Sequence, residues 1–154
     1  MKKKLNTLSV IAPVFNEEAN IYPFYKKICS VLKNIDLDWK ILFINDGSTD
    51  NSYKILKELS KKNSHVQFIQ LTKNFGKENA ITAGLDSVNS DATVIIDTDL
   101  QDPPELILEM IKFWHQGYDV IYAKRRYRKG ETWLKLINAK LFYYFFNKLS
   151  DTKI

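Results

Sequence analysis

The sequence is poor in cysteine and in long apolar segments. Cys29 is the single cysteine among 154 residues, which excludes an internal disulfide and favours a reducing compartment. No apolar run reaches the roughly 18 residues that a transmembrane helix needs. Met1 and three lysines lead directly into a patterned strand, without the apolar stretch and cleavage site of a signal peptide. We therefore expect a cytoplasmic protein and, at this length, a single domain.

Several common phosphate-binding motifs are also missing. There is no G-x-x-x-x-G-K-[ST], which excludes a P-loop NTPase, and no G-x-G-x-x-G after the first expected strand, which argues against a dinucleotide-binding Rossmann site. The first loop lacks the Gly-rich turn with which a sugar nucleotidyltransferase wraps a triphosphate. His65 and His115 fit no H-E-x-x-H or triad arrangement, and we interpret them as surface histidines.

What the sequence does have is a regular alternation of strand and helix patterns. Apolar, β-branched runs predict strands at 7–14, 39–44, 66–71, 92–97 and 118–123. Helical spacing of apolar residues predicts helices at 21–32, 51–61, 77–88 and 103–116. This alternation with short loops predicts an α/β fold, in which a mostly parallel sheet carries helices on both faces.

Acidic residues follow the fourth strand, where ligands bind in open α/β sheets. On extended backbone Asp97 and Asp99 point to the same face, about 6.5 Å apart, and repel each other unless a cation or a hydrogen-bond donor neutralises them. Because few backbone amides are offered to phosphate here, we expect Mg²⁺ or Mn²⁺ to neutralise the negative charge. The alternative is that Asp97 and Asp99 are solvated turn residues. Asp102, before Pro103-Pro104-Glu105, is predicted to cap the next helix.

Four stretches resemble glycosyltransferase family 2, the inverting enzymes with a GT-A fold. They are residues 10–18 (VIAPVFNEE), 43–50 (FINDGSTD), 74–77 (NFGK, followed by Ala83-Gly84) and 97–105 (DTDLQDPPE). The last stretch resembles the polyprenyl-phosphate branch, which includes dolichyl-phosphate mannose synthases and the bacterial enzymes that load glucose onto undecaprenyl phosphate. The resemblance implies a metal-dependent enzyme that moves a sugar from a nucleotide-diphospho-sugar to a polyprenyl phosphate at the cytoplasmic membrane face, with no nucleic-acid partner.

The resemblance also implies a role for each site residue. Asp99, Arg125 and Arg128 are the expected catalytic residues, with both arginines on the acceptor loop. Asp46 would hold the base or the ribose, and the metal would lie on Asp97, Asp99 and Gln101. The whole nucleotide-sugar site would comprise Pro13, Phe15, Glu17, Ile44, Asp46, Asp97, Thr98, Asp99 and Gln101.

Basic residues are concentrated toward the C-terminal end. Residues 112–154 hold 10 Lys/Arg against 3 Asp/Glu, whereas residues 1–111 hold 13 against 15. Aromatic and apolar residues interleaved with lysines over 133–149 predict an amphipathic helix on an anionic membrane surface, or one that packs on its own domain. We thus expect a nucleotide-sugar-binding core over 1–124 and an acceptor region over 125–154, in a chain that associates peripherally with the membrane.

The resemblance implies that the family domain continues beyond residue 154, so a further polypeptide is an expected partner. Two alternatives stay open. One is a family 2 transferase that acts on a glycan or cell-wall polymer, which would need a general-base carboxylate. The other is a truncated nucleotide-sugar-binding module without catalysis.

Overall fold

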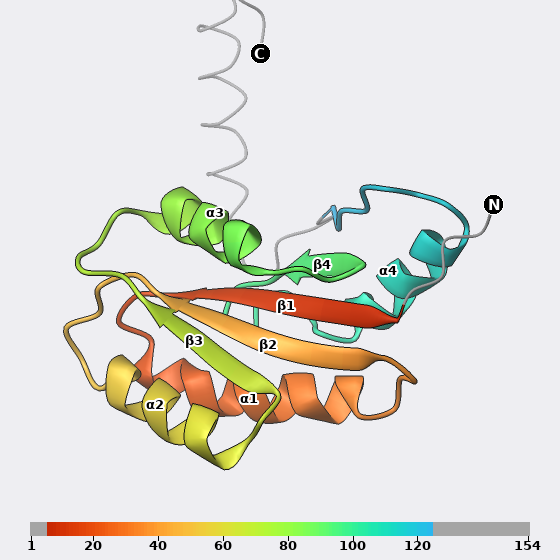
Figure 1. Ribbon diagram of the computed structural model, residues 1–154. Coiled ribbons are helices and arrows are strands. Elements are labelled where there is room, and N and C mark those ends of the chain that lie inside the picture. The colour runs from red at the N-terminus through yellow and green to blue at the C-terminus, as the bar shows by residue number, and fades with distance from the viewer. Residues whose placement is uncertain (1–5, 125–154) are drawn as a thin grey trace, which may run out of the picture. The chain divides into compact units, whose positions relative to one another are not determined.

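The computed structural model describes residues 6–124, which form a parallel sheet with helices on both of its faces (Figure 1). The chain divides into two compact units, residues 1–121 and 122–154, and the fold described here is that of the first. The strands are β1 (Thr7–Val14), β2 (Asp38–Asn45), β3 (Val66–Gln70) and β4 (Ala92–Ile95), in the order β3-β2-β1-β4. The helices are α1 (Glu18–Leu32), α2 (Ser52–Lys62), α3 (Lys77–Ser87) and α4 (Leu106–His115). The predicted α/β architecture is therefore confirmed.

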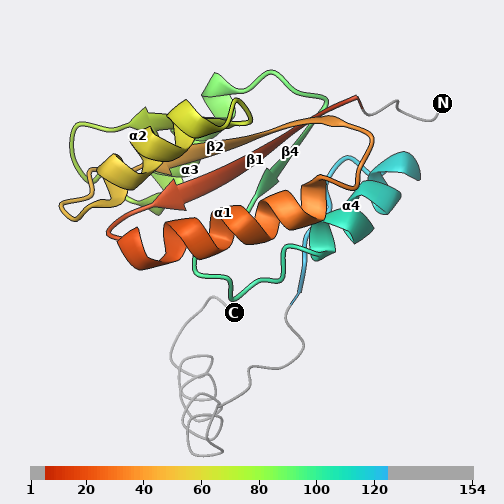
Figure 2. The same ribbon diagram turned by 90° about the horizontal axis from the view of Figure 1, so that it is seen from below.

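The central strand β1 is buried on both of its faces. Leu8, Val10, Ala12 and Val14 pack into the larger core with α1, α2 and Ile107 of α4. The alternate residue Ile11 packs into a smaller core beneath α3. Figure 2 shows α1 and α2 on the same side of the sheet, opposite α3. Burial on two faces explains why β1 has a nearly continuous apolar sequence instead of a polar alternation.

Helix α3 contacts the sheet closely at Gly84, a residue without a side chain. A Cβ atom built on Gly84 would lie 2.7 Å from Cγ2 of Ile11 and 3.2 Å from Cγ1 of Ile44. Any larger residue would therefore push α3 away from β1 and β2. The close approach fixes the position of Lys77, the first residue of α3.

The predicted start of the fourth helix is wrong by three residues. Helix α4 begins at Leu106, its N-cap position is Glu105, and no side-chain cap hydrogen bond is present there, so Asp102 is not the cap. Proline disfavours helical backbone in the residue before it, so Pro103 and Pro104 restrict Asp102 and Pro103 in turn. The N–H groups of Leu106 and Ile107 donate to the carbonyls of Pro103 and Pro104, three residues earlier, so a tighter turn includes the two prolines and the regular helix follows it.

The predicted fifth strand at 118–123 is not present either. This segment has no strand structure and pairs with none of the four strands of the described sheet. Val120 is 82% exposed and Tyr122 is 81% exposed. The preference of β-branched and aromatic residues for strands depends on a pleated surface to pack against, which this segment lacks in the described region.

None of the helices within residues 6–124 has both the length and the apolar composition that a membrane span requires.

Candidate functional site

The loops after β1, β2 and β4 and the start of α3 surround a cleft of about 260 Å³ at the carboxyl edge of the sheet. This is the edge at which open parallel sheets bind ligands. Seven of the predicted site residues line the cleft: Pro13, Phe15, Glu17, Asp46, Asp97, Thr98 and Asp99. Val14, Asn74, Gly76 and Lys77 complete its lining. Residues up to 86 positions apart in the sequence are thus gathered around one cavity.

Two predicted site residues that the structure describes, Ile44 and Gln101, do not line this cleft. Ile44 is 0% exposed and packs beneath α3, so its side chain is not available to a ligand. Gln101 is exposed outside the cleft, although its N–H donates to Oδ1 of Asp99 at 2.9 Å. Arg125 and Arg128 lie outside the described residues, and their predicted roles stay predictions.

The loops after β1 and β2 are tied to each other by reciprocal hydrogen bonds. Asn16 has a left-handed backbone (φ 55°); its N–H donates to Oγ of Ser48 at 2.9 Å, and its Oδ1 accepts from the N–H of Thr49 at 2.8 Å.

Asp50 accepts from the N–H of Glu18 at 3.0 Å and from the N–H of Ser52 at 2.9 Å. Burial by itself raises the pKa of Asp50, but the hydrogen bonds from Ser52 and Glu18 outweigh it and hold that pKa below its ordinary value. These bonds fix the β1 loop that carries Phe15 and Glu17 into the cleft.

Asp46 is a buried carboxylate that holds the loop before α3. It is 3% exposed; Oδ1 accepts from the N–H of Phe75 at 2.8 Å and Oδ2 accepts from the N–H of Gly76 at 2.9 Å. The next residue, Gly47, has a φ of 67°, and a Cβ atom there would lie 2.5 Å from the backbone N of Asn74. The end of β2 and the loop before α3 are therefore in direct backbone contact, and Asp46 fixes their spacing.

Lys77 is a site residue for which the sequence predicted no role. Its Nζ lies 2.6 Å from Oδ2 of Asp97, and both residues line the cleft. The repulsion expected between Asp97 and Asp99 is thus reduced by an ammonium group from α3. The sequence signal was indirect, because Lys77 closes the N-F-G-K motif at a helix start while its partner lies 20 positions away.

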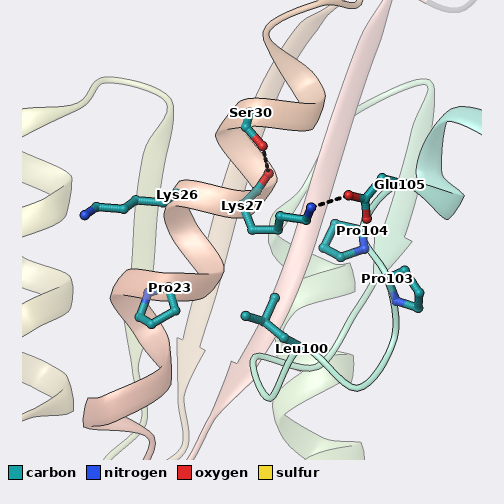
Figure 3. A pocket seen from close by; sticks show the side chains of 8 residues that line it. All are labelled: Pro23, Lys26, Lys27, Ser30, Leu100, Pro103, Pro104 and Glu105. Carbon is teal, nitrogen blue, oxygen red and sulfur yellow. Dashed lines mark hydrogen bonds and ion pairs between the residues drawn. The ribbon is translucent and has the colours of Figure 1, made fainter.

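The loop after β4 is held from its other side by α1. Lys27 of α1 forms an ion pair with Glu105, and this pair lowers the pKa of the Glu105 carboxyl. Figure 3 shows Lys27 reaching toward Glu105 across one end of a second groove, of about 640 Å³, while Lys26 points away. Leu100, between Asp99 and Gln101, has a left-handed backbone with a φ of 58° and contributes to this groove. The loop after β4, which carries Asp97, Asp99 and Leu100, therefore borders both cavities.

The carboxylates of the cleft suit a hard divalent ion that is bound by the protein and by a phosphate at the same time. Asp99 is exposed and lines the cleft, whereas Asp97 is paired with Lys77. Within residues 6–124, no group of three or more His, Cys, Asp or Glu side chains could hold a metal by itself. Mg²⁺ is usually held by one or two carboxylates together with substrate phosphates and water, and this arrangement needs no larger cluster. The residues present therefore fit a metal that arrives with its phosphate ligand.

Comparison with known proteins identifies the family. Residues 9–153 match the glycosyl transferase family 2 domain. The chain belongs to glycosyl transferase family 2. The mannosyltransferase PcManGT from Pyrobaculum calidifontis, solved in complex with GDP-Man and Mn²⁺, shares the fold at a TM-score of 0.62 and 20% identity, over 77% of this chain and 35% of that chain. The predicted GT-A fold is thereby confirmed.

Two sequence relatives are named as sugar transferases. The glycosyltransferase YkcC of Bacillus subtilis is 46% identical over 146 residues, which are 95% of this chain and 45% of that protein. The bactoprenol glucosyl transferase of Shigella phage SfV is 42% identical over 147 residues, which are 96% of this chain and 48% of that protein. The chain thus spans somewhat less than half the length of these curated relatives.

Proposed function

We propose that the protein transfers a sugar from a nucleotide-diphospho-sugar to a polyprenyl phosphate at the cytoplasmic membrane face, with inversion at the anomeric carbon. The observation that carries this proposal is the acidic cleft at the carboxyl edge of the sheet, where Asp97, Thr98 and Asp99 follow β4. Similarity to a bactoprenol glucosyl transferase supports the lipid acceptor. The Mn²⁺ and GDP-Man bound by the mannosyltransferase of the same fold support a divalent ion and a nucleotide-sugar donor.

In this proposal the cleft receives the donor in two parts. Phe15 and Glu17, on the loop fixed by Asn16, lie where the nucleoside would bind. Asp99 would hold Mg²⁺ or Mn²⁺ against the diphosphate, with Asp97 close by. The bound ion would supply positive charge to the departing diphosphate. The protein would thereby stabilise the charge that develops as the bond between the anomeric carbon and the diphosphate oxygen breaks.

The acceptor chemistry needs orientation more than it needs a base. An oxygen of the lipid phosphate would attack the anomeric carbon from the face opposite the diphosphate, which inverts that centre. A phosphate monoester is already anionic near pH 7, so no general base has to remove a proton. Arg125 and Arg128 suit the orienting role, because a guanidinium group binds phosphate through two parallel hydrogen bonds. We assign the membrane contact to residues 125–154, which are rich in lysine and aromatic residues.

A second candidate function is donor binding without transfer. The cleft formed by the described residues accounts for the donor side alone, so a module that binds the donor and requires a further polypeptide for transfer is a specific alternative. Donor binding and transfer are separable in the two proposals. Only the first requires that this chain alone form a glycosyl–phosphate bond.

Calorimetry followed by a transfer assay tests both candidates. UDP and GDP are titrated into the full chain with Mn²⁺, with Mg²⁺ and without metal, and the corresponding labelled nucleotide-sugars are then offered with undecaprenyl phosphate in vesicles. Metal-dependent binding with a labelled lipid product supports the transferase. Binding without product supports the binding module, and transfer only to a glycan would replace the lipid acceptor. Absence of diphosphate binding under all conditions would refute the donor site itself.

A further inference from the structure

The charges that line the cleft are unbalanced. Among the residues that the structure describes, four that line the cleft are carboxylic acids, Glu17, Asp46, Asp97 and Asp99, and Lys77 is the single lysine or arginine of that lining. A nucleoside diphosphate would bring further negative charge to this set. One divalent ion cannot neutralise both the phosphates and the remaining carboxylates, so the ammonium of Lys77 becomes important for where the diphosphate can lie.

We infer that Lys77 is a diphosphate-binding residue that exchanges partners, pairing with Asp97 in the free protein and with the donor phosphates when they enter. This inference rests on the proposed function, because it takes the cleft to be the donor site. It adds a residue to which the sequence assigned no part. It also explains the Lys77–Asp97 ion pair, which would hold the Lys77 ammonium group inside the cleft until a phosphate binds.

The surroundings of the pair permit this exchange. The side chains of Lys77 and Asp97 are 52% and 37% exposed, so their ion pair is screened by water and contributes little to stability. A phosphate with two negative charges competes well against one carboxylate for the same ammonium. The backbone of Lys77 stays in place during the exchange, because Asp46 holds the N–H groups of Phe75 and Gly76. Only the flexible end of the lysine side chain has to move.

A purely structural ion pair predicts a different response to substitution. If Lys77 only held Asp97 in position, removal of either partner would disturb the cleft in the same way. If Lys77 binds phosphate, removal of the lysine weakens phosphate binding, whereas removal of Asp97 releases the lysine and strengthens it. The two variants therefore move in opposite directions under the inference and in the same direction under the structural alternative.

Inorganic pyrophosphate without metal is the probe that separates these cases, because it has neither a nucleoside nor a sugar. We expect Lys77→Gln to weaken pyrophosphate binding about tenfold, as for the loss of one charge-assisted contact, and Asp97→Asn to strengthen it severalfold, both followed by phosphorus NMR titration of the full chain. The gain from Asp97→Asn should vanish in the Lys77→Gln background. A gain that persists without Lys77, or a loss in both single variants, overturns the inference.

Matched variants exclude a general effect of charge. Lys73→Gln removes the same charge from the loop that precedes Lys77. The Nζ of Lys73 lies over the ring of Phe75, 5.1 Å from its centroid, and Lys73 does not line the cleft. This substitution should leave pyrophosphate affinity within about twofold of wild type. Asp99→Asn removes a carboxylate with no described pair to Lys77 and should give a smaller gain than Asp97→Asn. Equal effects of Lys73→Gln and Lys77→Gln would reduce the result to long-range electrostatics and refute the assignment.

The nucleotide titrations keep the two proposals distinguishable. Wild-type protein that binds UDP or GDP, with Lys77→Gln binding as tightly, contradicts the role of Lys77 and leaves the donor site standing. Wild-type protein that binds neither nucleotide contradicts the donor site. Lys77→Arg, which keeps the charge, should retain most of the affinity, and a loss equal to that of Lys77→Gln would also count against the inference.

Discussion

Asp46→Asn tests whether the most buried acidic residue of the cleft holds a loop or contacts the ligand directly. In the wild type each carboxylate oxygen accepts one backbone N–H, from Phe75 and from Gly76. A hydrogen bond to a charged group contributes about 1.5–3 kcal/mol. The asparagine amide can accept only one of these bonds and turns its NH₂ group toward the other N–H. Because the N–H of Gly76 also donates to Oδ1 of Asn74, part of the loss is recovered. We expect a net destabilisation of about 2 kcal/mol.

Urea unfolding of the full chain, followed by circular dichroism, measures this cost. With an m-value of about 1–3 kcal/mol/M, the midpoint should fall by roughly 1 M. Asp36→Asn, at an exposed loop carboxylate, should stay within about 0.5 kcal/mol of wild type. Diphosphate affinity should fall together with stability, because the loop that positions Lys77 loosens. Lost affinity with unchanged stability would refute the holding role and show that Asp46 acts through the ligand alone.

Three further predictions address other residues of the site and of the sheet. Gly47→Ala should destabilise the fold by about 2 kcal/mol or more in urea unfolding, because a Cβ atom at φ 67° would overlap the backbone beyond β3; Gly117→Ala, at φ 100° with nothing within 4 Å, should cost less, and equal costs would contradict the contact argument. Asp99→Ala should abolish metal-dependent binding of UDP or GDP in calorimetry, and unchanged affinity would refute its metal role. N–H donors hold the pKa of Asp91 below its ordinary value of 3.8, so its stabilisation is complete above that value and is lost as the pH falls through the lowered pKa. The melting temperature of Asp91→Asn should therefore lie below wild type at pH 7 and converge with it as the pH falls below 3.8, and a constant difference would contradict this.

The sheet was predictable because strands that are buried on both faces have nearly continuous apolar sequences. β1 and β2 lie in the middle of the sheet and are covered on both faces, so their apolar runs could not be mistaken for surface. The cleft was predictable for a related reason. Parallel strands end at one edge, and polar residues placed after several strand ends must therefore meet there. Strand ends alone placed Asp46 and Asp97 at one edge, 51 positions apart in the chain.

What the sequence did not predict depends on the direction in which side chains point. Ile44 precedes Asp46 by two positions, yet it is buried beneath α3, because no motif states how closely a helix approaches the sheet. The pairing of Lys77 with Asp97 depends on that same approach, through Gly84. The segment 118–123 has the composition of a strand but no described strand beside it. These outcomes are set by tertiary contacts, which local patterns do not record.

The two sides of the cleft differ in how firmly they are held, and this difference suggests how it works. The β1 loop is fixed to the β2 loop through Asn16 and Asp50, which makes the proposed nucleoside side rigid before any ligand arrives. On the phosphate side, exposed Asp99 and the screened Lys77–Asp97 pair can rearrange at little cost. Under the proposed function, a rigid nucleoside side lowers the entropy lost on donor binding, whereas an adjustable phosphate side lets Lys77 move from Asp97 to the incoming diphosphate. Specificity for the base should therefore reside in the β1 and β2 loops, and the response to metal and phosphate in Lys77, Asp97 and Asp99.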